Sequence, residues 1–167
     1  MASSDLATAL QKRRDFESGK IWASYIRPEL YLGSGRDASN LEQLKVHRIT
    51  HIINVADDVE NFHEGDEFVY LNLGIADFGQ DPGISRCFNQ AKEFVDVVRR
   101  DGGVVLVHCA NGSNRSVTIV IALLMLIEQL SLKESMEEVR KCRPSARPLK
   151  DNWKELEKLE NSLQSRG

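Results

Sequence analysis

The sequence predicts an α/β domain in which helices flank a central, mostly parallel five-stranded sheet. Three observations indicate this fold class. Short apolar runs of strand type alternate with runs of helix type along much of the chain, and three helix-type runs close it. In addition, residues 104–121 read as an apolar strand, a short polar loop with a glycine, and the start of a long apolar helix. This strand–loop–helix unit is typical of α/β proteins.

The predicted strands are short, rich in β-branched and aromatic residues, and bounded by turn residues. The run at 49–55 is apolar and rich in isoleucine, which predicts a buried parallel strand. The five predicted strands are residues 21–26, 29–33, 49–55, 68–73 and 104–107.

Apolar residues at three- and four-residue steps predict the helices. One amphipathic helix carries Cys87 on its apolar face, so we interpret this cysteine as a core residue. Ser131 and Glu134 form a capping-box pattern at the start of another. We interpret the first helix as packed on the domain edge, with a border to the active site as the alternative. The predicted helices are residues 4–17, 37–46 (capped by Asp37 or Ser39), 84–100, 116–128, 131–141 and 149–164.

The length of 167 residues predicts one domain, with an N-terminal helix in residues 1–20 and the main domain in residues 21–167. The hydrophobic content of 41% is ordinary for a globular protein, so a sizeable core is expected. The net charge of -3 provides no basic field that would recruit nucleic acid or an anionic membrane. The longest apolar run, 117–127, is too short to span a bilayer.

The three cysteines, Cys87, Cys109 and Cys142, are an odd number without metal-ligand spacing. This spacing predicts no metal site at the cysteines, and we also expect no cofactor. A reduced compartment, the cytoplasm or also the nucleus, fits free thiols. The histidines His47, His51 and His63 share no spacing and no visible partner in the sequence, and we interpret them as structural or solvent-facing.

The segment 108–116 places a thiol and a guanidinium at the two ends of a glycine-containing loop. Backbone N–H groups in a tight turn that continues into a helix form a concave anion site, and Gly112 allows a backbone conformation that other residues avoid. The same field favours a thiolate at Cys109, while Arg115 offers a planar fork of donors to two phosphate oxygens. The expected chemistry is attack of the sulfur on phosphorus with a phosphocysteine intermediate, and Ser116 could donate a hydrogen bond to the departing sulfur. The alternative is a buried structural cysteine at a strand end.

The pattern His108-Cys109-(five residues)-Arg115-Ser116, with Gly112 in the middle, resembles the signature of the cysteine-based protein phosphatases, and of their dual-specificity branch in particular. Asn114 stands where that branch more often has serine. The resemblance covers about residues 25–159. It implies a phosphatase-type fold with a strand, a phosphate-binding loop and a helix. It also implies a shallow pocket for phosphoserine, phosphothreonine and phosphotyrosine.

A general acid is needed as well, because thiolate attack must expel an alkoxide or phenoxide. Asp77 follows a predicted strand in a glycine-flanked loop, at a separation from Cys109 that resembles the acid loop of the family. Asp81 is the next candidate, and Asp57 and Asp58 are more distant ones. A turn-capping role for Asp77 is the structural alternative.

The resemblance implies a metal-free mechanism in which the loop holds the three non-bridging phosphate oxygens. His108 is expected to orient the loop and support the thiolate by hydrogen bonding, without acting as a general base. The expected catalytic residues are Cys109, Arg115, Asp77, Ser116 and His108. The expected phosphate-binding residues are Ala110, Asn111, Gly112, Ser113, Asn114 and Arg115.

The expected partner is a phosphoprotein substrate, such as a phosphorylated kinase. Two rival functions are a phosphoprotein-binding scaffold of the pseudophosphatase type and an RNA or lipid phosphatase of the same superfamily. The uncharged variable positions of the loop argue against inositide lipids, and the low overall basicity argues against RNA.

A basic cluster could be cations near a helix C-terminus or a second anion site for an acidic or doubly phosphorylated substrate; it comprises Lys141, Arg143, Arg147 and Lys150.

Overall fold

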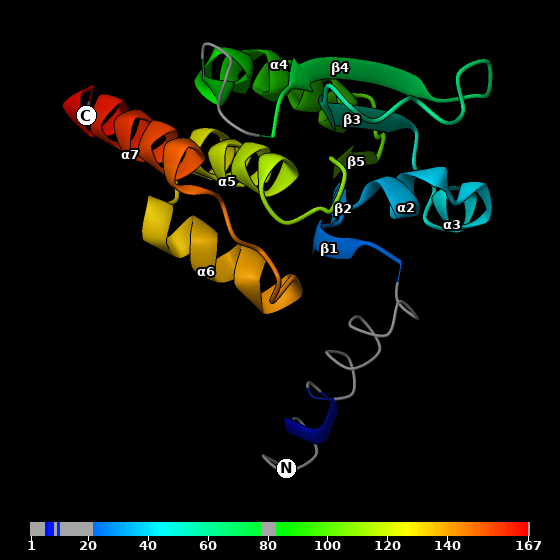
Figure 1. Ribbon diagram of the computed structural model, residues 1–167, viewed down its shortest axis with the longest axis horizontal. Coiled ribbons are helices and arrows are strands. Elements are labelled where there is room, and N and C mark those ends of the chain that lie inside the picture. The colour runs from blue at the N-terminus through cyan, green and yellow to red at the C-terminus, as the bar shows by residue number, and fades with distance from the viewer. Residues whose placement is uncertain (1–5, 9, 11–21, 78–82, 167) are drawn as a thin grey trace.

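A five-stranded sheet forms the centre of the molecule (Figure 1). The computed structural model describes residues 6–8, 10, 22–77 and 83–166. The strand order is β1-β2-β5-β3-β4, and only the edge pair β1–β2 is antiparallel. The predicted fold class is therefore confirmed. The strands are β1 (Ser24–Arg27), β2 (Leu30–Gly33), β3 (His51–Ala56), β4 (Val69–Ile75) and β5 (Val105–His108).

The parallel pairings position the loops that matter for function. β5 lies between β2 and β3, and β4 pairs with the other side of β3. Because these four strands run in the same direction, the loops that follow them emerge at one edge of the sheet. The loops after β3, β4 and β5 contain the predicted acids and the predicted nucleophile.

Two short helices cover one face of the sheet, α2 (Gly35–Ser39) and α3 (Leu41–Val46). The prediction of one helix over 37–46 is wrong, because the chain leaves helical geometry at Asn40 (φ -85°, ψ 87°). The Asn40 side chain accepts a hydrogen bond from the amide of Gln43 and so caps α3. Ser34, and neither Asp37 nor Ser39, caps α2. Asn40, which ends α2 and caps the start of α3, thus divides the segment.

The other face is covered by η1 (Ile84–Cys87), α4 (Phe88–Arg100), α5 (Arg115–Glu128), α6 (Leu132–Cys142) and α7 (Lys150–Ser165) (Figure 1). The helix α5 is at the centre of this layer and is buried from Arg115 to Met125, as its apolar sequence predicted. Cys87 is 3% exposed, so its interpretation as a core residue is confirmed. The predicted helix at 84–100 begins with a 3-10 turn, η1.

Most of the predicted N-terminal helix lies outside the described residues. Residues 6–8 and 10 are helical, but Leu6 and Leu10 are 62% and 46% exposed. These two leucines therefore do not support the interpretation of a helix packed on the domain edge. Within the part of the chain that the structure describes, no helix has the length and apolar character that crossing a membrane requires.

The cap of α6 provides a test of the helical layer. The Ser131 hydroxyl accepts a hydrogen bond from the Glu134 amide at 3.0 Å, so Ser131→Ala should lower the free energy of unfolding by about 1 kcal/mol. Urea denaturation measures this difference. Ser165→Ala is the matched control, because the Ser165 hydroxyl only donates to the Ser162 carbonyl at the exposed end of α7. Equal effects of the two substitutions would contradict the capping role.

Candidate active site

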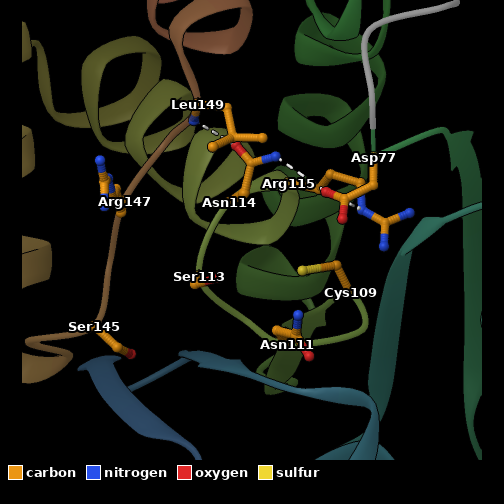
Figure 2. A pocket seen from close by; sticks show the side chains of 9 residues that line it. All are labelled: Asp77, Cys109, Asn111, Ser113, Asn114, Arg115, Ser145, Arg147 and Leu149. Atoms are coloured by element: carbon orange, nitrogen blue, oxygen red, sulfur yellow. Dashed lines mark hydrogen bonds and ion pairs between the residues drawn. The ribbon is translucent and has the colours of Figure 1, made fainter.

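A pocket of about 420 Å³ lies where the loops after β4 and β5 meet the segment before α7. The nucleophile candidate Cys109 and the acid candidate Asp77 both line it, together with Arg115 (Figure 2). The other lining residues are Asn111, Ser113, Asn114, Ser145, Arg147 and Leu149. The structure thus brings together residues that the sequence predicted from separate segments.

The backbone carbonyls of the phosphate-binding loop, residues 109–115, are held by groups outside the loop. The Ala110 carbonyl accepts a hydrogen bond from the Gly35 amide at 2.9 Å, and the Ser113 carbonyl accepts one from the Arg147 amide at 2.6 Å. At the end of the loop, the Asn114 carbonyl accepts from the Thr118 amide at 2.9 Å.

Arg143 supports the middle of the same loop. Its Nε donates to the Gly112 carbonyl at 2.6 Å and its Nη2 to the Asn111 carbonyl at 3.4 Å. Its Nη1 donates to the Ser24 hydroxyl at 3.1 Å. The side chain is 3% exposed, and this burial lowers the pKa of Arg143 below its usual value, against the opposing influence of Asp37.

Gly112 satisfies two requirements that exclude a side chain. Its φ of 71° is in the left-handed region, which favours glycine. A Cβ atom there would also lie 2.5 Å from Arg143 Nη2 and 2.6 Å from the Gly33 carbonyl oxygen. The close approach lets the Gly112 amide point inward, where it donates to Cys109 Sγ at 3.3 Å.

Two hydrogen-bonding groups lie close to the sulfur of Cys109. Besides the Gly112 amide, the Ser116 hydroxyl lies 3.1 Å from Sγ, and it is the donor when the sulfur is ionised. Ser116 is in the first turn of α5, whose N-terminal end carries partial positive charge. The predicted contact between Ser116 and the sulfur is therefore present in the structure.

Arg115 is 1% exposed, and carboxylates from the other strand ends compensate its charge. Its Nη1 donates to Asp58 Oδ1 and to the Ile75 carbonyl, both at 2.8 Å, and lies 3.6 Å from Asp57 Oδ1. The hydrogen bond from Arg115 lowers the pKa of Asp58 below its usual value. Asp57 and Asp58 thus contact the arginine, although their side chains remain 48% and 59% exposed.

Asp77 contacts the loop through one oxygen. Its Oδ1 accepts a hydrogen bond from Asn114 Nδ2 at 3.1 Å and lies 3.4 Å from Arg115 Nε (Figure 2). This second contact is an ion pair without a hydrogen bond, because within the described residues Arg115 Nε has no hydrogen-bond partner. Asp81, the alternative acid, lies outside the described residues.

His108 is buried at the end of β5 and bonds the loop, not the sulfur. Its Nδ1 lies 3.1 Å from the Cys109 carbonyl oxygen, and since a carbonyl can only accept, Nδ1 carries the proton. Burial lowers the pKa of His108, so the ring is neutral at neutral pH. This geometry fits a residue that orients the loop.

Arg143 is the residue whose contribution the sequence analysis missed. It was grouped with three other cations near the end of α6, yet it is buried under the loop, whereas Arg147 is exposed and lines the pocket. The available signal was that Arg143 immediately precedes a proline, where a helix must end and the chain can turn inward. Over the residues that the structure describes, no group of three or more histidine, cysteine or acidic side chains is arranged to hold a metal ion.

Comparison with known proteins agrees with this geometry. The family model described as dual specificity phosphatase, catalytic domain, matches residues 30–162. Dual specificity protein phosphatase 1 of Arabidopsis thaliana is 40% identical over 141 residues, which cover 84% of this chain and 70% of that protein. Protein phosphatase Slingshot homolog 3 of Homo sapiens is 36% identical over 151 residues, but the chain covers only 23% of its length.

Solved structures have the same fold. Human DUSP28 superimposes with a TM-score of 0.81 and 28% sequence identity, over 86% of this chain and 96% of that one. A human tyrosine phosphatase-like serine/threonine/tyrosine-interacting protein superimposes with a TM-score of 0.77 and 32% identity, over 85% of this chain and 97% of that one.

The fold and the site together define a cysteine-based protein phosphatase. The chain belongs to the dual specificity phosphatase family, as the signature in its sequence indicated. Membership of this family implies phosphoprotein substrates.

The contacts of Arg143 predict a joint effect on stability and activity. Arg143→Met leaves the buried Gly112 carbonyl and the partly buried Asn111 carbonyl without this donor, so the free energy of unfolding should fall by about 2–4 kcal/mol. Phosphate release from an aryl phosphate should fall by roughly tenfold or more, because a displaced loop misaligns its amides. Urea denaturation and steady-state kinetics measure both quantities. Arg140→Met, at an exposed position of α6, is the control, and a matching small effect of Arg143→Met would refute the supporting role.

The buried ring of His108 predicts a pH dependence of stability. The unfolded chain takes up a proton at this ring near pH 6.5, but burial lowers the folded-state pKa, so acid favours the unfolded state. Below about pH 6.5 the free energy of unfolding should therefore fall, by at most about 1.4 kcal/mol per pH unit from this residue. Urea denaturation of the wild type and His108→Asn at pH 7 and pH 5.5 measures the difference. The decrease should be smaller in the variant, and an unchanged decrease would exclude His108 as its source.

Proposed function

We propose that the chain hydrolyses phosphotyrosine, phosphoserine and phosphothreonine in proteins through a phosphocysteine intermediate on Cys109. One observation carries the proposal: two donors, the Gly112 amide and the Ser116 hydroxyl, point at the Cys109 sulfur in a pocket that Asp77 and Arg115 also line. A structural cysteine would require no such donors and no opposing acid. The arrangement supports a sulfur that reacts as an anion.

In the first step, Cys109 Sγ attacks phosphorus, the S–P bond forms and the P–O bond to the leaving group breaks. The loop amides and the Arg115 guanidinium stabilise the charge on the non-bridging oxygens. They are in place before the reaction, because the loop carbonyls are hydrogen-bonded to groups outside the loop and the guanidinium is bonded to Asp58. Asp77 gives its proton to the leaving oxygen.

In the second step, water attacks the phosphocysteine and Asp77 takes up the proton that the water loses. The P–S bond breaks, and the sulfur departs as a thiolate. The Ser116 hydroxyl at 3.1 Å and the Gly112 amide at 3.3 Å stabilise the departing thiolate. Phosphate is released and Asp77 is protonated again for the next cycle.

The lining of the pocket supports acceptance of both alcohol and phenol esters. No aromatic side chain is present among the described residues that line it, so nothing there selects a substrate ring by stacking. The similarity to the human tyrosine phosphatase-like serine/threonine/tyrosine-interacting protein keeps a phosphoprotein-binding scaffold as the second candidate function. The presence of Cys109 with its two donors favours the enzyme.

We further propose that residues 21–167 form the catalytic domain and residues 1–20 an N-terminal helix outside it. The match of the family model to residues 30–162 supports the first assignment. Within the described residues, Cys87, Cys109 and Cys142 are not joined in disulfide bonds, which supports a reduced compartment such as the cytoplasm or nucleus. A phosphorylated kinase is one substrate that a phosphopeptide panel would test.

The proposal predicts a thiol-dependent, metal-independent activity. Phosphate release from 4-nitrophenyl phosphate should persist in EDTA and vanish in Cys109→Ser. Asp77→Asn should lower the turnover of phenyl phosphate by roughly a hundredfold, because that leaving group needs a proton, and should remove the decline of activity at high pH.

Phosphopeptide binding by the same proteins separates the two candidate functions. Turnover by the wild type together with peptide capture by Cys109→Ser fits the enzyme. A wild type that binds phosphopeptide in its folded state but releases no phosphate would refute the enzyme and favour the scaffold.

A further inference from the structure

Asn114 is the N-cap residue of α5, but its side chain does not cap that helix. The side chain is turned instead toward Asp77 and toward the start of α7, as Figure 2 shows. The residue is 6% exposed, so its amide is buried among these partners. The usual reason for asparagine at a helix start is therefore absent, and its contacts require another explanation.

The orientation of the Asn114 amide follows from its partners. The Leu149 backbone amide lies 2.7 Å from Oδ1, and the Asn152 side-chain nitrogen lies 3.0 Å from the same atom. A backbone N–H can only donate, so the atom that faces Leu149 must be the oxygen. The group that faces Asp77 is then the NH₂ group, and it donates to Asp77 Oδ1 at 3.1 Å.

This bond distinguishes the two oxygens of Asp77. The Asn114 NH₂ group can only donate, so Oδ1 of Asp77 accepts from it and carries no proton toward it. The same oxygen lies 3.4 Å from Nε of the cationic Arg115. Both neighbours therefore favour negative charge on Oδ1. The proton of the carboxylic acid then belongs on Oδ2.

We propose that Asn114 is a positioning residue for the general acid: it fixes Oδ1 of Asp77 as an acceptor, so that Oδ2 carries the proton to the leaving group. The inference rests on the proposed phosphatase function and assigns Asn114 a part in its acid step. In the forward step the Oδ2–H bond breaks as the leaving oxygen gains the proton. In hydrolysis Oδ2 accepts a proton from the attacking water.

The same side chain connects three segments of the site. Its main chain belongs to the phosphate-binding loop, Oδ1 accepts from the start of α7, and Nδ2 donates to the loop after β4. Asp77 is thus held in register with the loop that binds the phosphate. A serine at this position is shorter and cannot bridge the Leu149 amide and Asp77 at the same time.

The test compares two substrates that differ in their need for an acid. Phenyl phosphate has a poor leaving group, whereas 4-nitrophenyl phosphate has a good one. In Asn114→Ser, kcat/KM, which reports the step that expels the leaving group, should fall by roughly tenfold for phenyl phosphate and by less than about threefold for 4-nitrophenyl phosphate, with KM nearly unchanged for both. Combined with Asp77→Asn, the Asn114→Ser change should cause little additional loss, because both act on one proton transfer.

Two further variants control for structure. Asn152→Ala removes one donor to Oδ1 but leaves the bond to Asp77, so it should keep the wild-type ratio of the two substrates. Asn114→Asp keeps an acceptor for Leu149 and Asn152 but replaces the donor to Asp77 by an oxygen, and it should reproduce the selective loss on phenyl phosphate. If Asn114→Ser does not fold, Asn114→Asp decides the question.

An equal loss on both substrates, a loss confined to KM, or a full additional loss in the Asp77→Asn background would overturn the inference. Each outcome is distinct from failure of the proposed function. If the proposed function failed, the wild type itself would release no phosphate, or Cys109→Ser would remain active.

Discussion

The direction of the carbonyl groups in the phosphate-binding loop is the constraint on which the rest of the site depends. A dianion needs several N–H donors converging on one point, and a loop can provide them only if its carbonyls point elsewhere. Buried carbonyls must be paired, so each one requires a donor outside the loop. The amides of Gly35 and Arg147 and the guanidinium of Arg143 meet this requirement. The conformation of the nine-residue signature at 108–116 therefore depends on segments that are distant in the chain.

The parallel sheet then determines which charges surround the loop. Because β3, β4 and β5 end at one edge, Asp57, Asp58 and Asp77 meet Arg115 without any sequence proximity. The guanidinium is buried, and a buried charge without partners is costly. The carboxylates are partly exposed, so they compensate the charge of the arginine while their own contact with water is retained.

The parts of the fold and site that depend on local pattern could be predicted from the sequence. The alternation of apolar runs predicted the sheet and its helices, and the spacing of Cys109, Gly112 and Arg115 predicted the loop. Contacts that depend on tertiary packing could not be predicted in this way. The cap at Asn40 divides a helix that its apolar residues suggested was continuous, and Arg143 resembles a surface cation until the turn after α6 brings it under the loop. Asn114 was expected to bind phosphate through the loop, and its side chain gains another role only from Asp77 and Leu149.

The site therefore combines two kinds of preorganisation that act on different atoms. Arg143 and the sheet fix the backbone, and hence the donors that meet the phosphate. Asn114 fixes one side-chain oxygen, and hence the path of a proton. Both operate through groups whose donor or acceptor character does not change during the reaction, an amide N–H, an amide oxygen or a guanidinium. Such groups need no reorganisation as charge moves from sulfur to phosphate to the leaving oxygen, and this is the condition under which fixed dipoles stabilise a transition state more effectively than water does.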